Sequence, residues 1–212
     1  MKMDRLAIIG AGGHGKVVAD AAELSGWADI SFFDDYRPVG EIHLNWPIAG
    51  NLHDFLQNHS HFDAAIVAIG DNQSRFDVCQ KLLGLSIRLV SIIHPQAIVS
   101  RYAQIGVGSV VFAGAIINPD TKIGMATIIN TNACVEHDCD LGSAVHISPG
   151  AHLAGSVTLG NLSWVGIGAS VRNNIVIGPK AIIGAGAAVV SNVAAGITVM
   201  GVPAVAYFRD RP

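Results

Sequence analysis

The segment IGVGSVVFAGAIINPDTKIG, residues 105–124, carries an aliphatic side chain at every sixth position. The same spacing continues from Ile105 to Val189 without an exception. An α-helix does not keep every sixth residue on one face, and a flat strand alternates every second residue. A chain that turns a corner every six residues fits the pattern, because each flat side then buries one branched aliphatic residue. We therefore predict a hexapeptide parallel β-helix, called the column below, rather than a sandwich of irregularly spaced strands.

Glycines indicate how many sides the column has. A glycine follows the aliphatic residue at Gly106, Gly124, Gly142, Gly160 and Gly178, each eighteen residues after the last. Three hexads therefore make one coil, the column has three sides, and residues eighteen apart lie above one another. We expect glycines and other small residues at the corners, where a positive φ costs glycine least.

Composition excludes several classes of protein. Of 212 residues, 50% are hydrophobic and only 14% are charged, against roughly 25% charged in an average domain. The longest apolar stretch, Val107 to Ile117, is about half of the ~20 residues that span a bilayer. The net charge of -3 favours neither a nucleic-acid nor a membrane partner. Three cysteines do not make a disulfide framework, and the strand-like LAIIG begins at Leu6 without a secretory signal, so we expect a cytoplasmic protein.

The first ninety residues read as alternating strands and helices. We predict strands over 6–10, 30–33, 63–69 and 87–92, and helices over 15–24 and 73–83, with Gly26 ending the first helix. This pattern is typical of a parallel α/β sheet, and its length is about half of a doubly wound dinucleotide fold. The predicted domains are a half-Rossmann-like domain over 1–93 and the β-helix over 94–212.

A glycine-rich loop, GAGGHGK at residues 10–16, joins the first strand to the first helix. Such loops let backbone N–H groups approach a phosphate at a helix N-terminus. Asp34 and Asp35 follow about twenty residues on, where dinucleotide folds place a ribose-binding acid. Because the domain has only about half of the dinucleotide-binding sheet, we expect it to bind one nucleotide rather than the dinucleotide NAD. A tight glycine turn with two solvent-facing aspartates remains the alternative.

The column has few ionisable residues, and they concentrate in NTNACVEHDCD, residues 130–140. His137 between two carboxylates suits a general base, because histidine titrates near neutral pH and an acid orients its tautomer. The alternative is a polar residue on an outer face. A second alternative is catalysis through an acyl-enzyme intermediate on Cys134 or Cys139.

Zinc bound by histidines is the competing interpretation, since His137, His146 and His152 lie close in sequence. His146 and His152 are six residues apart, hence on different sides of one column, and His137 takes a different place in its hexad. We therefore predict no metal site within one column. Convergence of these histidines across a subunit boundary stays open.

Taken together, these motifs resemble the bacterial nucleotide-sugar acetyltransferases of the sialic acid O-acetyltransferase/PglD-like group, which belong to the left-handed β-helix acyltransferases. The resemblance covers the whole chain and rests on six motifs. They are IIGAGGHGK (8–16), FFDD (32–35), VAIGDNQSR (67–75), INTNACVEHDCDLG (129–142), HISPGAHLAGSVTLG (146–160) and GVPA (201–204). It implies a left-handed coil, a homotrimer, and acetyl-CoA bound between neighbouring columns.

The resemblance also implies site residues. It assigns the catalytic base to His137 and its carboxylate partner to Asp138, where relatives often carry Glu; Glu136 is a rival partner. The acetyl-CoA site falls on His146, Ile167 and Ala185, while Asn130 matches a polar residue near the base and is assigned to the acceptor substrate. The nucleotide-sugar site falls on Gly12, Gly13, His14, Asp34, Asp35 and Gly70. Val205 stands where the family often has a Lys or Arg that meets a coenzyme A phosphate.

The implied function is acetyl transfer from acetyl-CoA to the amine of a nucleotide-linked 4-amino-4,6-dideoxy sugar, preferably UDP-linked, in bacterial glycan biosynthesis. O-acetylation of a sugar such as sialic acid is the nearest alternative. A trimeric zinc lyase and a non-catalytic nucleotide-sugar-binding trimer are the others.

Overall fold

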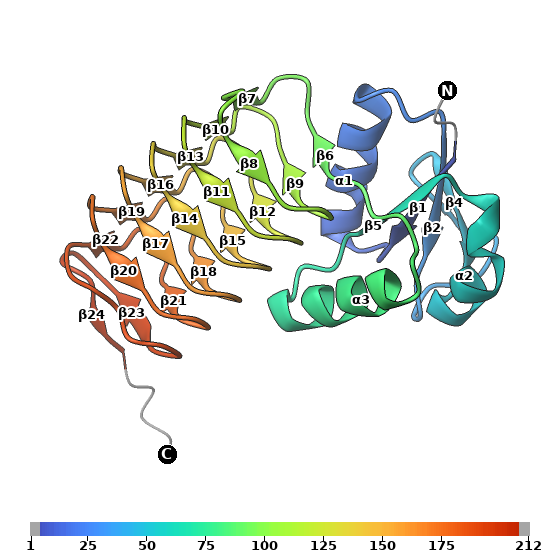
Figure 1. Cartoon of the computed structure of the whole chain (residues 1–212). Helices are drawn as coiled ribbons and strands as arrows, with labels where there is room; N and C mark the ends of the chain where they lie inside the picture. The colour runs from blue at the N-terminus through green and yellow to red at the C-terminus, as the bar shows by residue number, and fades with distance from the viewer. Residues whose placement is uncertain (1–4, 208–212) are drawn as a thin grey trace, which may run out of the picture. The chain divides into compact units, whose positions relative to one another are not determined.

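The computed structural model describes residues 5–207, which divide into two compact units, one ending at Pro95 and one beginning at Gln96 (Figure 1). The first unit is an α/β domain and the second is a column of short parallel strands. This architecture confirms the predicted fold class. None of the helices in the described range is long and apolar enough to cross a bilayer.

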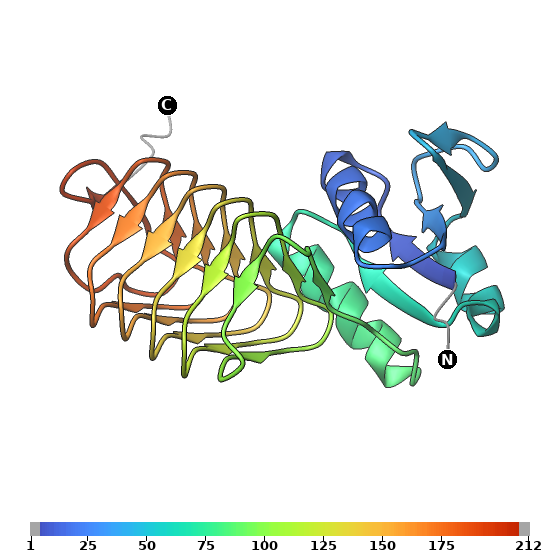
Figure 2. The same cartoon turned by 90° about the horizontal axis from the view of Figure 1, so that it is seen from above.

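The first unit is built on a five-stranded sheet of order β3-β4-β2-β1-β5, in which β1 pairs in parallel with both β2 and β5. Its elements are β1 (Arg5–Ile9), α1 (Gly13–Leu24), β2 (Asp29–Phe33), β3 (Ile42–His43), β4 (Trp46–Gly50), α2 (Leu52–Asn58), the 3₁₀ turn η1 (His59–His61), β5 (Ala64–Val67), α3 (Asn72–Gly84) and β6 (Ile92–Ile93). The helices α1 and α3 cover opposite faces of the sheet (Figure 2). The last four residues of β1 and of β2 and all of β5 are buried, as expected of strands covered on both faces.

Two features of this unit differ from the sequence prediction. The strand expected over 87–92 is reduced to a single parallel bridge between Ala65 and Leu89, followed by the two-residue β6. The hairpin β3–β4 and the helix α2 were not predicted. By contrast, α1 ends as expected, because Gly26 has a φ of +99° and donates its N–H to the Glu23 carbonyl.

The column has three sides, each a ladder of parallel two-residue strands related by eighteen residues. Side 1 contains β7 (Ile98–Val99), β10 (Ile116–Ile117), β13 (Cys134–Val135), β16 (His152–Leu153), β19 (Ser170–Val171) and β22 (Ala188–Val189). Side 2 contains β8 (Gln104–Ile105), β11 (Lys122–Ile123), β14 (Asp140–Leu141), β17 (Thr158–Leu159) and β20 (Val176–Ile177). Side 3 contains β9 (Val110–Val111), β12 (Ile128–Ile129), β15 (His146–Ile147), β18 (Trp164–Val165), β21 (Ile182–Ile183), β23 (Thr198–Met200) and the antiparallel β24 (Val205–Ala206).

The aliphatic series fills the inside of the column, as predicted. Every member from Val111 to Val189 is at most 4% exposed, and Ile105, at the first coil, packs against them partly buried. Each of these residues is the second of its strand, so the first residue lies on the outer face, where it is exposed in most strands but buried at Val110 and Ile128. The outer faces therefore present the side chains that are free to bind substrates or other chains.

Glycines and other small residues form most of the corners, as predicted, with Asp and Asn at several others and Leu162 and Lys180 as exceptions. A positive φ recurs at every sixth residue from Gly108 to Gly186, and most of these residues are not glycine. The glycines spaced by eighteen serve instead where successive coils approach closely. A Cβ on Gly124, for example, would lie 2.5 Å from the backbone of Gly142, so a side chain there would force the coils apart.

Candidate active site

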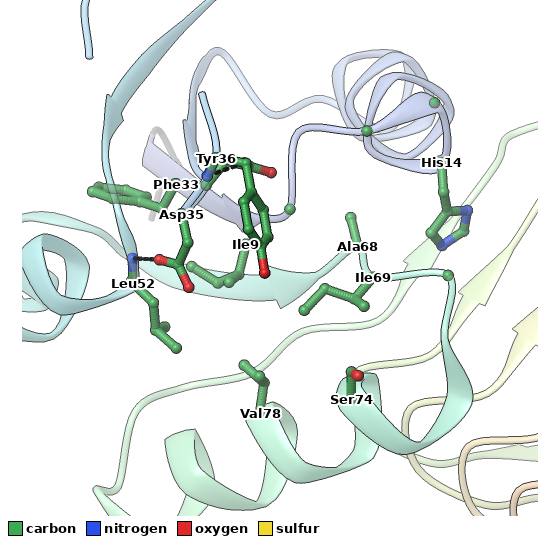
Figure 3. A pocket seen from close by; sticks show the side chains of 15 residues that line it. Ile9, His14, Phe33, Asp35, Tyr36, Leu52, Ala68, Ile69, Ser74 and Val78 are labelled. Atoms are coloured by element: carbon green, nitrogen blue, oxygen red, sulfur yellow. Dashed lines mark hydrogen bonds between the residues drawn. The ribbon is translucent and has the colours of Figure 1, made fainter. Parts of the chain in front are cut away.

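The first unit contains a cavity of about 610 Å³ at the carboxyl ends of β1, β2 and β5 (Figure 3). Its volume is in the range of small-ligand sites, and its position is where open α/β sheets bind ligands. All six residues expected in a nucleotide-sugar site line it, namely Gly12, Gly13, His14, Asp34, Asp35 and Gly70. The structure thus brings together residues that are up to 58 positions apart in the sequence.

The glycine loop has two kinds of glycine. A Cβ on Gly10 would lie 2.9 Å from the Ala68 carbonyl oxygen, and one on Gly15 would overlap the Gly10 carbonyl, so both positions exclude a side chain. Gly12 and Gly13 have open space around them and border the cavity. Helix α1 begins there without a side-chain cap. Its first N–H groups are therefore placed to bind an anion in the cavity.

The two aspartates have different surroundings. Asp34 accepts hydrogen bonds from Ala11 N–H at 2.7 Å and from Tyr36 N–H at 2.9 Å, and so braces the glycine loop against the end of β2. Asp35 is exposed, and its Oδ1 accepts a hydrogen bond from Leu52 N–H at 3.0 Å (Figure 3). No other described residue bonds to its Oδ2. Asp35 is therefore the acid of the pair that is better placed to meet a ligand.

His14 lies at the opposite end of the cavity from Asp35 and Leu52 (Figure 3). Burial, and secondly the positive charge of Arg75, lower the pKa of His14 to about 4. The imidazole is therefore neutral near pH 7. It offers a ligand one hydrogen-bond donor or acceptor rather than a charge.

Several residues of the cavity were missed by the sequence analysis. Tyr36 is 96% exposed and lies over the cavity, Leu52 lies at the same end as Asp35, and Ser74 and Val78 line the side formed by α3 (Figure 3). Leu52 belongs to the unpredicted helix α2, and Ser74 and Val78 face the cavity from α3. Tyr36 directly follows the aspartate pair, and this position next to a suspected ligand-binding acid was the one available signal.

On the column, His137 and Asp138 form a hydrogen-bonded pair at the corner between sides 1 and 2. The His137 Nδ1 lies 2.7 Å from Asp138 Oδ2, and the two side chains are 60% and 57% exposed. An aspartate that accepts from Nδ1–H leaves the lone pair on Nε2, which makes Nε2 the basic atom. The same ring covers the backbone of Gly155 on the next coil, because a Cβ there would lie 2.7 Å from Nε2.

Glu136, the rival partner, is held elsewhere. Its Oε2 accepts a hydrogen bond from Asn118 Nδ2 at 2.8 Å, and the Cys134 thiol points at its Oε1 from 3.6 Å. Burial and then the charge of Glu136 raise the pKa of Cys134, and burial also raises the pKa of Cys139. Both thiols therefore stay protonated near neutral pH, which disfavours an acyl-enzyme at either cysteine.

A second polar group lies on side 3, around His146. Asn130 Nδ2 is 3.1 Å from His146 Nε2, and Asn130 Oδ1 accepts from Thr131 N–H, which fixes the orientation of the amide. Trp164 stacks on His146 with ring centroids 5.3 Å apart, and donates its Nε1–H to Ser148 Oγ at 2.7 Å. Asn130 thus contacts His146, and its assignment to the acceptor substrate stays a prediction.

Ile167 and Ala185, expected at the acetyl-CoA site, follow strands β18 and β21 on neighbouring coils. Ile167 is 58% exposed and Ala185 is exposed, and Gly186 N–H donates to the Ile167 carbonyl at 2.8 Å. They form a short apolar track along the outside of the column. Their assignment to the acetyl-CoA site stays a prediction.

Two further findings concern the column. A polar cavity of about 400 Å³ borders Asp138 on side 2, and its other lining residues include Asp120, Lys122 and Asp140. Within residues 5–207 no group of three or more His, Cys, Asp or Glu side chains is arranged to hold a metal ion. His146 lies on side 3 and His152 on side 1, so these two histidines face different sides of the column, as their six-residue spacing predicts.

Comparison with known proteins gives matches over the first unit and over the whole chain. The family described as the PglD N-terminal domain matches residues 5–82. The acetyltransferase domain of PglB from Neisseria gonorrhoeae, solved in complex with acetyl coenzyme A, shares 40% identity at a TM-score of 0.92, covering 96% of this chain and 100% of that one.

Two other solved structures match at similar length. Perosamine N-acetyltransferase from Caulobacter crescentus, solved with CoA and GDP-perosamine, shares 35% identity at a TM-score of 0.93 and covers 98% of each chain. WeeI from Acinetobacter baumannii shares 26% identity at a TM-score of 0.88, covering 96% of this chain and 99% of that one. Each of these matches extends over both units of this chain.

Proposed function

The chain belongs to the PglD-like sugar acetyltransferases of the hexapeptide-repeat, left-handed β-helix acyltransferases, and from this membership we propose that it N-acetylates a nucleotide-linked amino-sugar. The donor is acetyl-CoA, and the acceptor is the amine of a 4-amino-4,6-dideoxy sugar carried on UDP. The product would serve bacterial glycan biosynthesis. Relatives crystallised with acetyl-CoA, or with CoA and GDP-perosamine, support both substrate classes.

The observation that carries the proposal is the His137–Asp138 pair. The 2.7 Å bond to Asp138 orients the imidazole, and the large exposed fraction of His137 leaves Nε2 accessible to an acceptor. A histidine oriented by a carboxylate supports general-base catalysis worth about 10²–10⁴-fold in rate. Asp138 would stabilise the imidazolium that forms when His137 takes a proton.

In the proposed reaction, the sugar amine attacks the thioester carbonyl while His137 Nε2 removes an amine proton. A C–N bond forms, the C–S bond breaks, and the proton passes from the imidazolium to the departing CoA thiolate. Backbone N–H groups or His146 would stabilise the negative charge on the carbonyl oxygen. The acetyl group moves directly between substrates that are held together, so no cysteine intermediate is required.

We propose that each domain holds one substrate. In the domain over 1–93, the N-terminus of α1 with Gly12 and Gly13 would bind the diphosphate, with His14 and Gly70 beside it. Asp35 would accept from the ribose or the base, while Asp34 supports the loop. In the domain over 94–212, Ile167 and Ala185 would line the pantetheine channel next to His146. By family membership the protein would be a homotrimer, with acetyl-CoA between neighbouring columns.

The test of the base is His137→Ala. We expect kcat to fall by at least about 10²-fold, while the affinity for acetyl-CoA and the oligomeric state, measured by calorimetry and light scattering, stay unchanged. Turnover within threefold of the wild type would show that His137 is not the base.

The test of the acceptor is a thiol-release assay with acetyl-CoA against UDP-linked and GDP-linked amino-sugars and free sialic acid. Release with a UDP-amino-sugar supports the proposal. Preference for a GDP-linked sugar would correct the nucleotide, and release with sialic acid alone would replace N-acetylation by O-acetylation. Absence of release with every acceptor would favour a binding protein.

A further inference from the structure

Helix α3 buries a charged side chain beside the cavity of the first unit. Arg75 is 1% exposed and is the largest fully buried side chain among residues 5–207. Burying a guanidinium costs free energy unless its donors are satisfied, so an arginine in this position needs a structural or functional reason. Burial lowers the pKa of Arg75 to about 10, which leaves it charged at neutral pH.

The guanidinium is bonded to the segment that forms one wall of the cavity. Nη1 donates to the carbonyls of Ile69 and Gly70, each at 3.0 Å, and Nη2 donates to Asn72 Oδ1 at 2.7 Å. Ile69 and Gly70 line the cavity directly, whereas Arg75 lies behind them. One rigid side chain therefore holds two successive carbonyls of a loop at the end of β5.

The segment that precedes Gly70 also packs directly against the first glycine of the glycine loop. The backbone and side chain of residues 68 and 69 would meet a Cβ on Gly10 at 2.9 and 3.2 Å, so the two loops are packed as closely as backbones allow. The charge of Arg75 also reaches His14, whose pKa it helps to lower. A shift of the Ile69–Gly70 segment would therefore disturb both sides of the anion site.

We propose that Arg75 is a positioning residue of the nucleotide-sugar site, whose guanidinium holds the Ile69–Gly70 segment in the conformation that binds the nucleotide. The inference rests on the proposed function, because it requires that cavity to bind a nucleotide. Arg75 acts through the backbone and touches no substrate. Lysine is a poor replacement, since one ammonium does not reproduce the planar fork that reaches both carbonyls and Asn72.

The experiment compares Arg75→Lys, which keeps the charge, with Arg75→Met, which removes it. UDP and GDP are titrated calorimetrically into the full-length proteins, and the pKa of His14 is followed by NMR. We expect both variants to weaken nucleotide binding by about tenfold or more, with KM for acetyl-CoA within twofold of wild type. The pKa of His14 should rise in Arg75→Met and stay low in Arg75→Lys. This difference distinguishes the effect of the positive charge from the effect of the guanidinium's hydrogen bonds. Gln73→Ala, an exposed position on the same helix, is the control and should bind as wild type.

Wild-type affinity in Arg75→Lys would overturn the inference, because the charge alone would then suffice. Asn72→Ala removes the acceptor of Nη2 and leaves the two carbonyl bonds, so it keeps the inference testable if the Arg75 variants do not fold. We expect it to weaken binding by about threefold, and unchanged affinity would contradict the inference. A wild-type protein that binds neither UDP nor GDP would instead refute the proposed function at this cavity.

Discussion

Gly155→Ala should displace His137, the proposed base, without changing the stability of the column. The Cβ of an alanine at 155 would lie 2.6 Å from Cε1 and 2.7 Å from Nε2 of His137. Gly155 is not among the glycines with a positive φ, so its backbone accepts an alanine without strain. The three nearest atoms all belong to the His137 imidazole, whose side chain is 60% exposed and able to swing toward solvent.

The size of the displacement follows from ordinary contact distances. Van der Waals contact begins at 3.4 Å, so the ring must retreat by about 0.8 Å or rotate away. A misplacement of about 1 Å in a catalytic group costs on the order of 10² in rate, which corresponds to about 2.7 kcal/mol of barrier. The free energy of unfolding should change by less than about 1 kcal/mol, since no buried group is disturbed.

The assay measures kcat, KM for acetyl-CoA and the denaturation midpoint of Gly155→Ala beside Gly84→Ala, which adds the same methyl group in open space. We expect kcat to fall about 10²-fold only at position 155. In a His137→Ala background the Gly155→Ala change should have no further effect, because the displaced base is already absent. A kcat within threefold of wild type at position 155, or an equal loss in the double variant, would refute this reasoning.

Three other outcomes are expected. The pKa of His14 is lowered to about 4 in the folded chain. Between about pH 6.5 and 4 the unfolded chain therefore binds more protons than the folded chain. The free energy of unfolding should consequently fall by about 2–3 kcal/mol as the pH drops through this window. His14→Gln should lose that part of the pH dependence in urea titrations, and an unchanged profile would contradict the shift. Cys134→Ser with Cys139→Ser should retain kcat within about fivefold, because both thiols stay protonated, whereas inactivity of the folded double variant would revive an acyl-enzyme. Gly142→Ala should lower the free energy of unfolding by more than about 3 kcal/mol, because its Cβ would meet the backbone of Asn161 at 2.7 Å, and a melting temperature equal to wild type would disprove this close approach.

The column was predictable because one physical requirement repeats in it. Each two-residue strand buries its second residue, and this burial alone produces the six-residue aliphatic series. The first unit was less predictable in detail. The pairs and short runs that form β3, β4 and α2 are too brief to show periodicity, and their pairing depends on contacts between segments.

The sequence indicated which residues of the candidate site lie near one another, but not their hydrogen bonds. The sequence places Glu136 and Asp138 symmetrically about His137, and only the three-dimensional structure shows Asn118 holding the first and His137 the second. The eighteen-residue period places Ile128 beside His146 as its ladder partner. Asn130 follows Ile128 by two residues, so its contact with His146 could have been predicted from the repeat. The burial of Arg75 was not predictable, because sequence does not show whether an arginine on a polar helix is buried.

The corner geometry also explains why an aspartate suits the position beside His137, the proposed base. Asp138 occupies one of the positions that recur every six residues with a positive φ, and its own φ is +60°. Asp and Asn adopt this conformation more readily than most residues, whereas a longer glutamate gains no such preference. At this corner the short side chain already reaches Nδ1 of His137 at 2.7 Å. The fold that turns the chain every sixth residue thus also places Asp138 against Nδ1 of His137, so the repeat and the candidate site have one structural origin.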